Sequence, residues 1–355
     1  MPRSNPQGVR VVSGLLLLTL CLTLQIGTAD AAARQLVILN WPDYLAPEVV
    51  SRFEQEFDAE VVEVHFDSDE HRTQTLLNSA KGFDLILVSN SDLSAYARQG
   101  WISRYDPQQL PNLKHLDPKW QQAFPSSVDF GVPYFWGSVG ILYRRDRVDQ
   151  PITRWRQLLK PSASLAGHIN MIHDGRELIS IALKSLGHSI NSSNPDHLAE
   201  VEQLLLEQAP LVKSYRYLSL KPDSEIIRGD IHAAVVYNGD ALMLQRYSDD
   251  LVYTLPDEGS YLWVDYFSIG AQASDSELAH QFINFINRPE IAAEQAEFVY
   301  YASPNREALK LLSSEYLNNP TIFPSSKQLD NSEFLQPASA DLMRKRNAIS
   351  AKVLP

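Results

Sequence analysis

Cysteine is almost absent from the 355-residue chain, whose single cysteine, Cys21, lies in an apolar run near the start. The rest of the chain therefore cannot hold disulfides, thiol nucleophiles or zinc–thiolate sites. Positive charge is also scarce, because 31 Lys+Arg stand against 43 Asp+Glu and give a formal net charge of −12. Since phosphate backbones are bound by clustered Lys and Arg, we expect no nucleic-acid partner. A field of this sign favours a cationic ligand.

Long apolar runs are also lacking, apart from Val11–Ile26, which follows two arginines and precedes the small-residue stretch Thr28–Ala33. This order is typical of a Sec-type signal peptide, and the run is short for a membrane span. We predict that residues 1–33 are a signal peptide cleaved near Ala31 or Ala33. The mature protein is then expected in the periplasm.

Short apolar runs alternate with helical patterns along the rest of the chain. Such alternation predicts an α/β fold with parallel strands, and its return from Ile169 onward predicts a second α/β domain. The predicted strands are Leu36–Asn40, Val61–Phe66, Asp84–Val88, Ile169–Ile172, Ala233–Tyr237 and Tyr261–Ile269. The predicted helices are one capped by Ser68 or Asp69, and Pro47–Phe57, Leu93–Arg98, Leu178–Leu186, Leu198–Glu207, Glu277–Phe285 and Pro289–Phe298.

Carboxylates and aromatic residues follow several of these strands. The segments concerned are Asn40–Tyr44, Ser89–Asp92, His173–Glu177 and Tyr237–Asp240. Ligands of open parallel sheets bind beyond the carboxyl ends of the strands. Carboxylates neutralise ammonium groups, and each aromatic face attracts a cation by up to about 2 kcal/mol. The pattern therefore predicts a site for an organic cation.

Several motifs, taken in order, resemble the spermidine/putrescine-binding family of periplasmic substrate-binding proteins. They are Asn40–Tyr44, Asp84–Ser89, Val132–Gly137, Asp174–Glu177, Tyr237–Gly239, Trp263–Asp265 and Tyr301–Asn305. The resemblance covers about residues 35–340. It implies a two-lobed periplasmic-binding-protein fold of type II, with discontinuous lobes around a hinge and a ligand cleft between them. We expect residues 34–138 plus 264–312 in lobe 1 and residues 139–263 plus 313–355 in lobe 2.

The resemblance also implies roles for individual residues. The positions that wall the methylene groups of a polyamine in the family are Trp41, Tyr44, Trp263 and Tyr301. Those that take its ammonium groups are Asp174, Glu177 and Asp265, and Ser89 matches a cleft hydroxyl. Asp43 and Tyr237, which replace a Glu and a Trp of the family, complete the predicted ligand set.

Other departures from the family pattern leave the preferred polyamine open. Pro42 replaces a hydroxyl residue and Ser91 an aromatic wall residue. Leu335 stands where the family has a glutamine contact, so that amide is lost unless Gln336 substitutes for it. The resemblance implies no cofactor, and a monomer that meets a membrane partner. That partner is an ABC-type polyamine importer or a receptor that makes or degrades cyclic-di-GMP and controls biofilm formation.

Each predicted site residue also has a purely structural interpretation. Asp174 and Glu177 have the spacing of a capping box at a helix start, and a single Trp, Tyr or Ser is as easily a core residue. Asp265 is different, because it lies two residues after Trp263 on the same strand face. A buried carboxylate there would be costly without a partner.

Two other classes of function find weaker support. His65 and His71 flank three carboxylates, and Tyr300-Tyr301 is similar to the paired tyrosines of ferric-ion-binding proteins, but no metal-ligand spacing is present. The segment Gly137–Gly140 misses the nucleophile-elbow spacing by one position, and no other catalytic motif is found. We therefore expect neither a metal site nor an enzyme.

Overall fold

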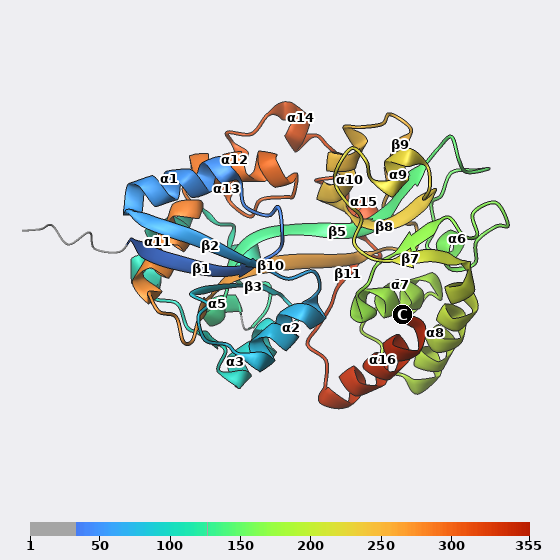
Figure 1. Ribbon diagram of the computed structural model, residues 1–355, viewed down its shortest axis with the longest axis horizontal. Helices are drawn as coiled ribbons and strands as arrows, with labels where there is room; N and C mark the ends of the chain where they lie inside the picture. Colours follow the sequence, from blue (N-terminus) through green and yellow to red (C-terminus); the bar gives the residue numbers. More distant parts are fainter. Residues whose placement is uncertain (1–32, 126) are drawn as a thin grey trace, which may run out of the picture. The chain divides into compact units, whose positions relative to one another are not determined.

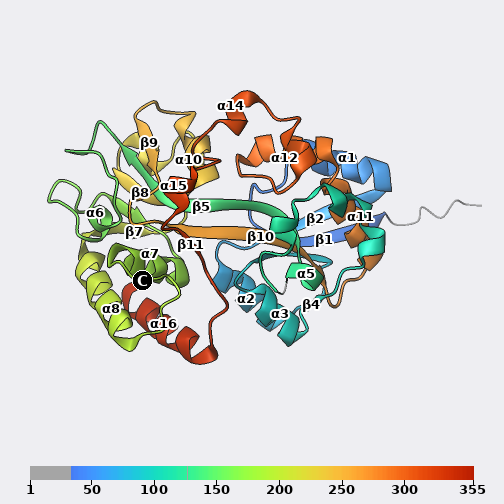
Figure 2. The same cartoon turned by 180° about the vertical axis from the view of Figure 1, so that it is seen from behind.

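The computed structural model describes residues 33–125 and 127–355. Apart from its last residue, the predicted signal peptide lies outside the described residues. In the described part, no helix is both long and apolar enough to cross a membrane. Figure 1 shows the arrangement of helices and strands, and Figure 2 shows the reverse side.

The strands join into one sheet path with the order β2-β1-β3-β10-β5-β8-β6-β7. β4 and β11 pair with β10, and β9 pairs with β5. Their bounds are β1 Arg34–Asn40, β2 Ala59–His65, β3 Leu85–Ser89, β4 Ile102–Ser103, β5 Val132–Arg144, β6 Ile169–Met171, β7 Val212–Tyr215, β8 Ala233–Tyr237, β9 Leu251–Thr254, β10 Tyr261–Gly270 and β11 Glu333–Phe334.

The predicted parallel pairing is found inside each half of this path. β1 is parallel to β2 and β3, and β6 is parallel to β7 and β8. The prediction of parallel strands does not hold where the halves meet, because β10 is antiparallel to β3 and β5, and β5 is antiparallel to β8. The apolar pattern of a buried strand does not reveal its direction.

Strand β5 connects the two halves. Its first part, Val132–Ser138, pairs with β10, whereas its second part, Val139–Arg144, pairs with β8 and β9. Figure 1 shows β5 and β10 running across the middle of this part of the chain. We call the half with β1–β4 the first lobe and the half with β6–β9 the second lobe.

Helices cover both lobes. Helices α1, α11 and α12 pack together on the first lobe, whereas α7, α8 and α16 pack together on the second. The bounds are α1 Pro47–Phe57, α2 Asp69–Asn78, α3 Leu93–Gln99, α4 Pro118–Gln121, α5 Ser127–Phe130, α6 Arg156–Leu159, α7 Gly175–Ser185, α8 Pro195–Gln208, α9 Glu225–Arg228, α10 Asn238–Gln245, α11 Ser276–Ile286, α12 Pro289–Val299, α13 Arg306–Leu309, α14 Ser314–Leu317, α15 Ser326–Leu329 and α16 Ala340–Val353.

Local sequence explains where several of these elements begin. Pro47 occupies the first turn of α1, where a missing N–H costs nothing, and Val49 and Phe53 form its buried face. The Ser68 hydroxyl caps α2 by accepting from the His71 N–H. Of the two predicted caps, Ser68 is therefore the correct one, and Asp69 becomes the first residue of the helix, free to point elsewhere.

Candidate ligand-binding site

A cavity lies at the junction of the two lobes and is lined by residues of both. The lining combines carboxylates, aromatic rings and a few apolar side chains from both lobes. The lining residues are Trp41, Pro42, Asp43, Tyr44, Asp67, Asp69, Ser89, Glu177, Tyr217, Leu220, Tyr237, Asp240, Met243, Tyr261, Trp263, Asp265, Val299 and Tyr301.

The loop between β1 and α1 forms one wall and is fixed from two sides. Asp43 adopts a left-handed backbone conformation, with φ of 57°, and turns the chain before Tyr44. The Tyr44 carbonyl accepts hydrogen bonds from the Tyr134 hydroxyl at 2.9 Å and from the Gln295 amide at 3.1 Å. These contacts hold Tyr44 in place, and its hydroxyl donates to Asp265 at 3.3 Å.

Strand β10 carries Trp263 and Asp265 on one face, as the sequence predicted. Asp265 is paired with Ser89 of β3 and Phe135 of β5, and the register of β5 shifts directly after it. Such bulges re-aim side chains near functional sites. A side chain at Gly137 would collide with the Asn238 side chain and lie 2.6 Å from the Trp263 ring, so the glycine of this β5 motif makes room for both.

Glu177 reaches the cavity from the first turn of α7. One of its oxygens accepts from the Tyr237 hydroxyl at 2.8 Å, while the other is buried and has no hydrogen-bond partner among the described residues. Asp174, in contrast, caps the helix by accepting from the N–H groups of Arg176 and Glu177 at 2.9 and 3.0 Å. The capping interpretation therefore describes Asp174, whereas Glu177 faces the cavity.

Asp240 is a further cavity carboxylate and lies in the first turn of α10. It accepts hydrogen bonds from the Tyr217 hydroxyl and, at 2.7 Å, from the Tyr301 hydroxyl. The neighbouring Gly239 is required by this arrangement, because a side chain there would lie 2.6 Å from the Tyr301 ring. The Tyr-Asn-Gly-Asp segment that begins at the last residue of β8 thus combines the close packing of Gly239 against Tyr301 with a buried carboxylate.

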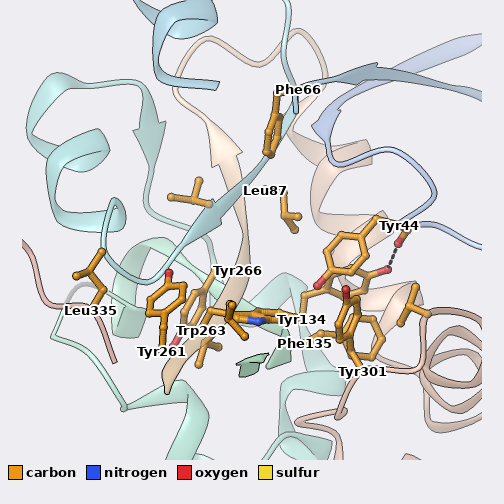
Figure 3. Packing of buried hydrophobic residues seen from close by; sticks show 14 of the residues in the cluster. Tyr44, Phe66, Leu87, Tyr134, Phe135, Tyr261, Trp263, Tyr266, Tyr301 and Leu335 are labelled. Carbon is orange, nitrogen blue, oxygen red and sulfur yellow. Dashed lines mark hydrogen bonds between the residues drawn. The ribbon is translucent and has the colours of Figure 1, made fainter. Parts of the chain in front are cut away.

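Aromatic rings form a continuous series along the cavity. Trp263 meets Tyr301 edge-on at 4.9 Å between ring centroids, and Tyr301 meets Tyr44 in the same way at 5.8 Å. The Tyr237 ring lies 6.0 Å from the Trp263 indole, between ring centroids, and is nearly perpendicular to it. Figure 3 shows Trp263 between Tyr261 and the group of Tyr44 and Tyr301. These rings present apolar surface between the carboxylates.

Asp265, Glu177 and Asp240 are buried carboxylates of the cavity, with exposed fractions of 6%, 5% and 5%. Burial raises the pKa of Asp265 to about 7 and that of Asp240 to about 6. Burial and the charge of Asp174 raise the pKa of Glu177 well above its ordinary value. In the described part of the chain, none of the three forms an ion pair with Lys, Arg or His. In the ionised form, each of these buried carboxylates would be stabilised by a cation that enters the cavity.

Asp69 also lines the cavity, but it has internal partners. Its two oxygens lie 2.7 Å from Arg72 and 2.6 Å from Arg176, and the Ser89 hydroxyl donates to it at 3.0 Å. Against the effect of burial, the two guanidinium groups hold the pKa of Asp69 below its ordinary value. Asp69 is therefore neutralised by the protein itself, unlike Asp265, Glu177 and Asp240.

Comparison with known proteins assigns the family. A sequence model of the bacterial extracellular solute-binding proteins matches residues 48–324. The chain belongs to this family. Its fold is the two-lobed one of these proteins, with the ligand cleft between the lobes. Members of the family bind solutes and are not enzymes.

Three similar proteins illustrate the relationship. The norspermidine sensor of Vibrio cholerae is 31% identical, over 92% of this chain and 89% of that protein. The spermidine/putrescine-binding periplasmic protein of Escherichia coli K12 is 30% identical, over 84% of this chain and 86% of that protein. The structure of the spermidine/putrescine ABC transporter substrate-binding protein from Streptococcus pneumoniae is 26% identical with a TM-score of 0.75, over 90% of this chain and 98% of that one.

In this solute-binding protein, nine of the ten predicted site residues line the cavity. They are Trp41, Asp43, Tyr44, Ser89, Glu177, Tyr237, Trp263, Asp265 and Tyr301. The tenth, Asp174, does not line it, because its side chain turns back to cap α7. Neither Leu335 nor Gln336 borders the cavity, so the predicted loss or replacement of an amide contact does not concern its wall.

Sequence reasoning missed several lining residues of the solute-binding protein. Asp240 stands at a strand end that the sequence had already marked and could have been found by that criterion. Tyr217 lies in the loop after β7 and no local pattern predicted its place. Asp69 was considered only as a helix cap and as one of the three carboxylates between His65 and His71.

The candidate metal ligands are separated in the structure. His71 bonds to Asp67 at 2.8 Å, whereas His65 lies 3.5 Å from Glu63, and both imidazoles are half-exposed. Tyr301 lies in the cavity, while Tyr300 ends α12 in a left-handed conformation. Across residues 33–125 and 127–355, no group of three or more His, Cys, Asp and Glu is placed to hold a metal ion.

Proposed function

We propose that the protein is a periplasmic polyamine-binding protein, which closes around a spermidine-, norspermidine- or putrescine-like ligand and presents it to a membrane partner. One observation carries the proposal. Three carboxylates, Glu177, Asp240 and Asp265, are buried in one cavity between aromatic rings. No Lys, Arg or His in the described part of the chain forms an ion pair with them. A polyamine supplies the missing charges.

The chemistry of the wall matches a polyamine better than other cations. Buried carboxylates are costly unless each is paired or protonated, so a ligand with two or more ammonium groups gains at several points. Its methylene chain fits the apolar faces of Trp263 and Tyr301 between these points. A single metal ion would instead need the oxygen ligands close together, and they come from β10, α7 and α10.

The proposed closure uses the strands that cross between the lobes. We place the hinge at Ser138–Val139, where β5 changes its pairing partners. This position supports a bound between residues 138 and 139. We propose residues 34–138 plus 264–312 as one lobe and residues 139–263 plus 313–355 as the other. A ligand that touches both lobes favours the closed arrangement, because its binding free energy is complete only there.

The same binding event serves either of two membrane partners. We propose delivery to an ABC-type polyamine importer, in line with the binding proteins of transport systems described above. The 31% identity to a norspermidine sensor over most of the chain favours a second candidate function. In that function, the protein reports bound polyamine to an inner-membrane cyclic-di-GMP receptor. Affinity capture of solubilised membrane proteins with the loaded protein separates them by recovering importer subunits or a receptor.

The proposal also covers the cellular location and the oligomeric state of the protein. Residues 1–33 act as a cleaved signal peptide, and the mature chain works in the periplasm as a monomer. It uses no cofactor and catalyses no reaction.

Isothermal titration with putrescine, cadaverine, norspermidine, spermidine and spermine tests the proposal. We expect saturable one-to-one binding of at least one of them, and weaker binding at pH 5 than at pH 8. The acidic weakening follows because Asp265 and Asp240, with pKa values of about 7 and 6, must lose their protons to pair with ammonium groups. No heat and no thermal stabilisation with any of the five would refute the function.

A further inference from the structure

Arg176 is the residue next to Glu177, yet its side chain does not line the ligand cavity. It lies in the first turn of α7, where a positive charge is disfavoured by the helix dipole. Its side chain is nevertheless only 14% exposed. An arginine buried at the unfavourable end of a helix must be stabilised by contacts outside that helix.

Those contacts are made to the other lobe. One guanidinium nitrogen lies 2.6 Å from Asp69, the first residue of α2, and another lies 2.7 Å from Asp92, which precedes α3. Both carboxylates have side chains that are 8% exposed. A second arginine of the first lobe, Arg72, lies 2.7 Å from Asp69 and 2.6 Å from Asp92. The four side chains form a closed square of two positive and two negative charges.

The square has one member on the second lobe and three on the first. The three members on the first lobe, Asp69, Arg72 and Asp92, therefore keep their mutual contacts when the lobes move apart. Arg176 loses its contacts with them when the cleft opens. Opening would leave Asp69 and Asp92 with only one of their two cations. Such charge pairs are strongest where water is excluded, as it is here.

We propose that Arg176 is a positioning residue that latches the closed cleft by binding Asp69 and Asp92 across the lobes. The inference rests on the proposed function, because a latch matters only if ligand binding and closure are coupled. Arg176 stabilises the closed arrangement without lending any atom to the ligand.

A latch has a characteristic signature in binding data. If Arg176 changes only the fraction of molecules able to close, the apparent Kd of every ligand rises by the same factor. A residue that contacts the ligand changes the Kd values by different factors, because polyamines place their ammonium groups differently. The ratio of affinities therefore separates the two roles.

The test compares Arg176→Gln, Arg176→Lys and Asp92→Asn with the parent by titration of the same five polyamines. We expect Arg176→Gln to weaken every bound polyamine by about tenfold or more, equally within about twofold. Arg176→Lys should recover part of the loss, since an ammonium pairs with one carboxylate but does not bridge two. Adding Asp92→Asn to Arg176→Gln should cost little more, because both changes break the same bridge.

Arg346→Gln is the matched control for a buried arginine. Arg346 is 3% exposed and donates to the carbonyls of Ile190 and Ser192, all within the second lobe. The Arg346→Gln variant should have a lower Tm than the parent, but its polyamine affinities should stay within about twofold of those of the parent. Circular dichroism confirms the fold of each variant.

The outcomes are separable. Affinities of Arg176→Gln within twofold of the parent, or losses that differ more than fivefold among polyamines, would overturn the latch. If the parent binds none of the five, the proposed function fails, and small-angle scattering without ligand decides the latch. A larger radius of gyration for Arg176→Gln then supports it, and equal radii refute it.

Discussion

The buried Asp265 carboxylate lowers the stability of the ligand-free protein, whereas the proposed function gives it a role in binding the ligand. Burial raises its pKa to about 7, while an Asp in an unfolded chain titrates near 4. The folded protein therefore binds more protons than the unfolded chain between about pH 4 and 7, and stability falls as pH rises through that window. At about 1.4 kcal/mol per pKa unit, the full penalty is about 4 kcal/mol.

Asp265→Asn is expected to act in opposite directions on stability and on binding. Without ligand, the Tm of the variant at pH 7.5 should exceed that of the parent, and its decline between pH 4.5 and 7.5 should be smaller. Polyamine affinity should fall several hundred-fold, because a buried ammonium loses a counter-charge worth about 3–5 kcal/mol. Thermal melts and titration measure both effects.

Glu48→Gln, at an exposed carboxylate of α1, is the control and should change neither quantity. An Asp265→Asn protein with parent affinity would remove this residue from the site. A variant less stable than the parent at pH 7.5 would show that the carboxylate is structural.

At the residue scale, sequence patterns found side chains that share a strand or follow its end. The spacing of Trp263 and Asp265 placed both on one face, and that face does border the cavity. Tyr217 was not predicted as a cavity residue, because its position depends on how the loop after β7 folds back toward Asp240. This contact joins residues that are 23 positions apart in the sequence. No local pattern contains that information.

Helix α7 separates two roles that the sequence could not separate. Asp174 and Glu177 have capping-box spacing, and the structure forms only the half in which Asp174 caps the helix. The other half is missing because the Glu177 side chain turns to Tyr237. One short segment therefore supplies a helix start and a cavity carboxylate.

Substitutions at Asp174 test this division. Asp174→Asn should keep the cap, since Asn caps as well as Asp, and should bind polyamines far better than Asp265→Asn does. Asp174→Ala should lose about 1 kcal/mol of stability and weaken binding further, because the first turn no longer holds Glu177 firmly. Chemical denaturation and titration give the two values. If Asp174→Asn binds as poorly as Asp265→Asn, then Asp174 contacts the ligand directly.

At the element scale, regular patterns predicted well and interrupted ones did not. Pro47–Phe57 and Ala233–Tyr237 have the predicted bounds, because an amphipathic helix and a short buried run are plain in the sequence. Strand β5 was not predicted, since Pro133 and Gly137 are unfavourable within a strand. Here Gly137 is required by the close approach of Asn238 and the indole of Trp263, and not by the strand.

For the whole molecule, composition and periodicity predicted an acidic protein with two α/β parts. They could not show that β5 and β10 join these parts, because a strand shared by two lobes has the same apolar pattern as one within a single lobe. The two-lobed arrangement came from the order of the motifs. The exact lobe bounds remain a prediction.

The shared strands have a consequence for how the protein unfolds. If the second lobe melted alone, β5 would lose its partners beyond Ser138 and expose unpaired backbone groups at the edge of the first lobe. The two lobes should therefore unfold as a single cooperative unit, and scanning calorimetry should show one peak whose van't Hoff and calorimetric enthalpies agree. Two resolved peaks would contradict this. A polyamine bound between the lobes then shifts one transition, and protects the chain from end to end against proteolysis that requires unfolding.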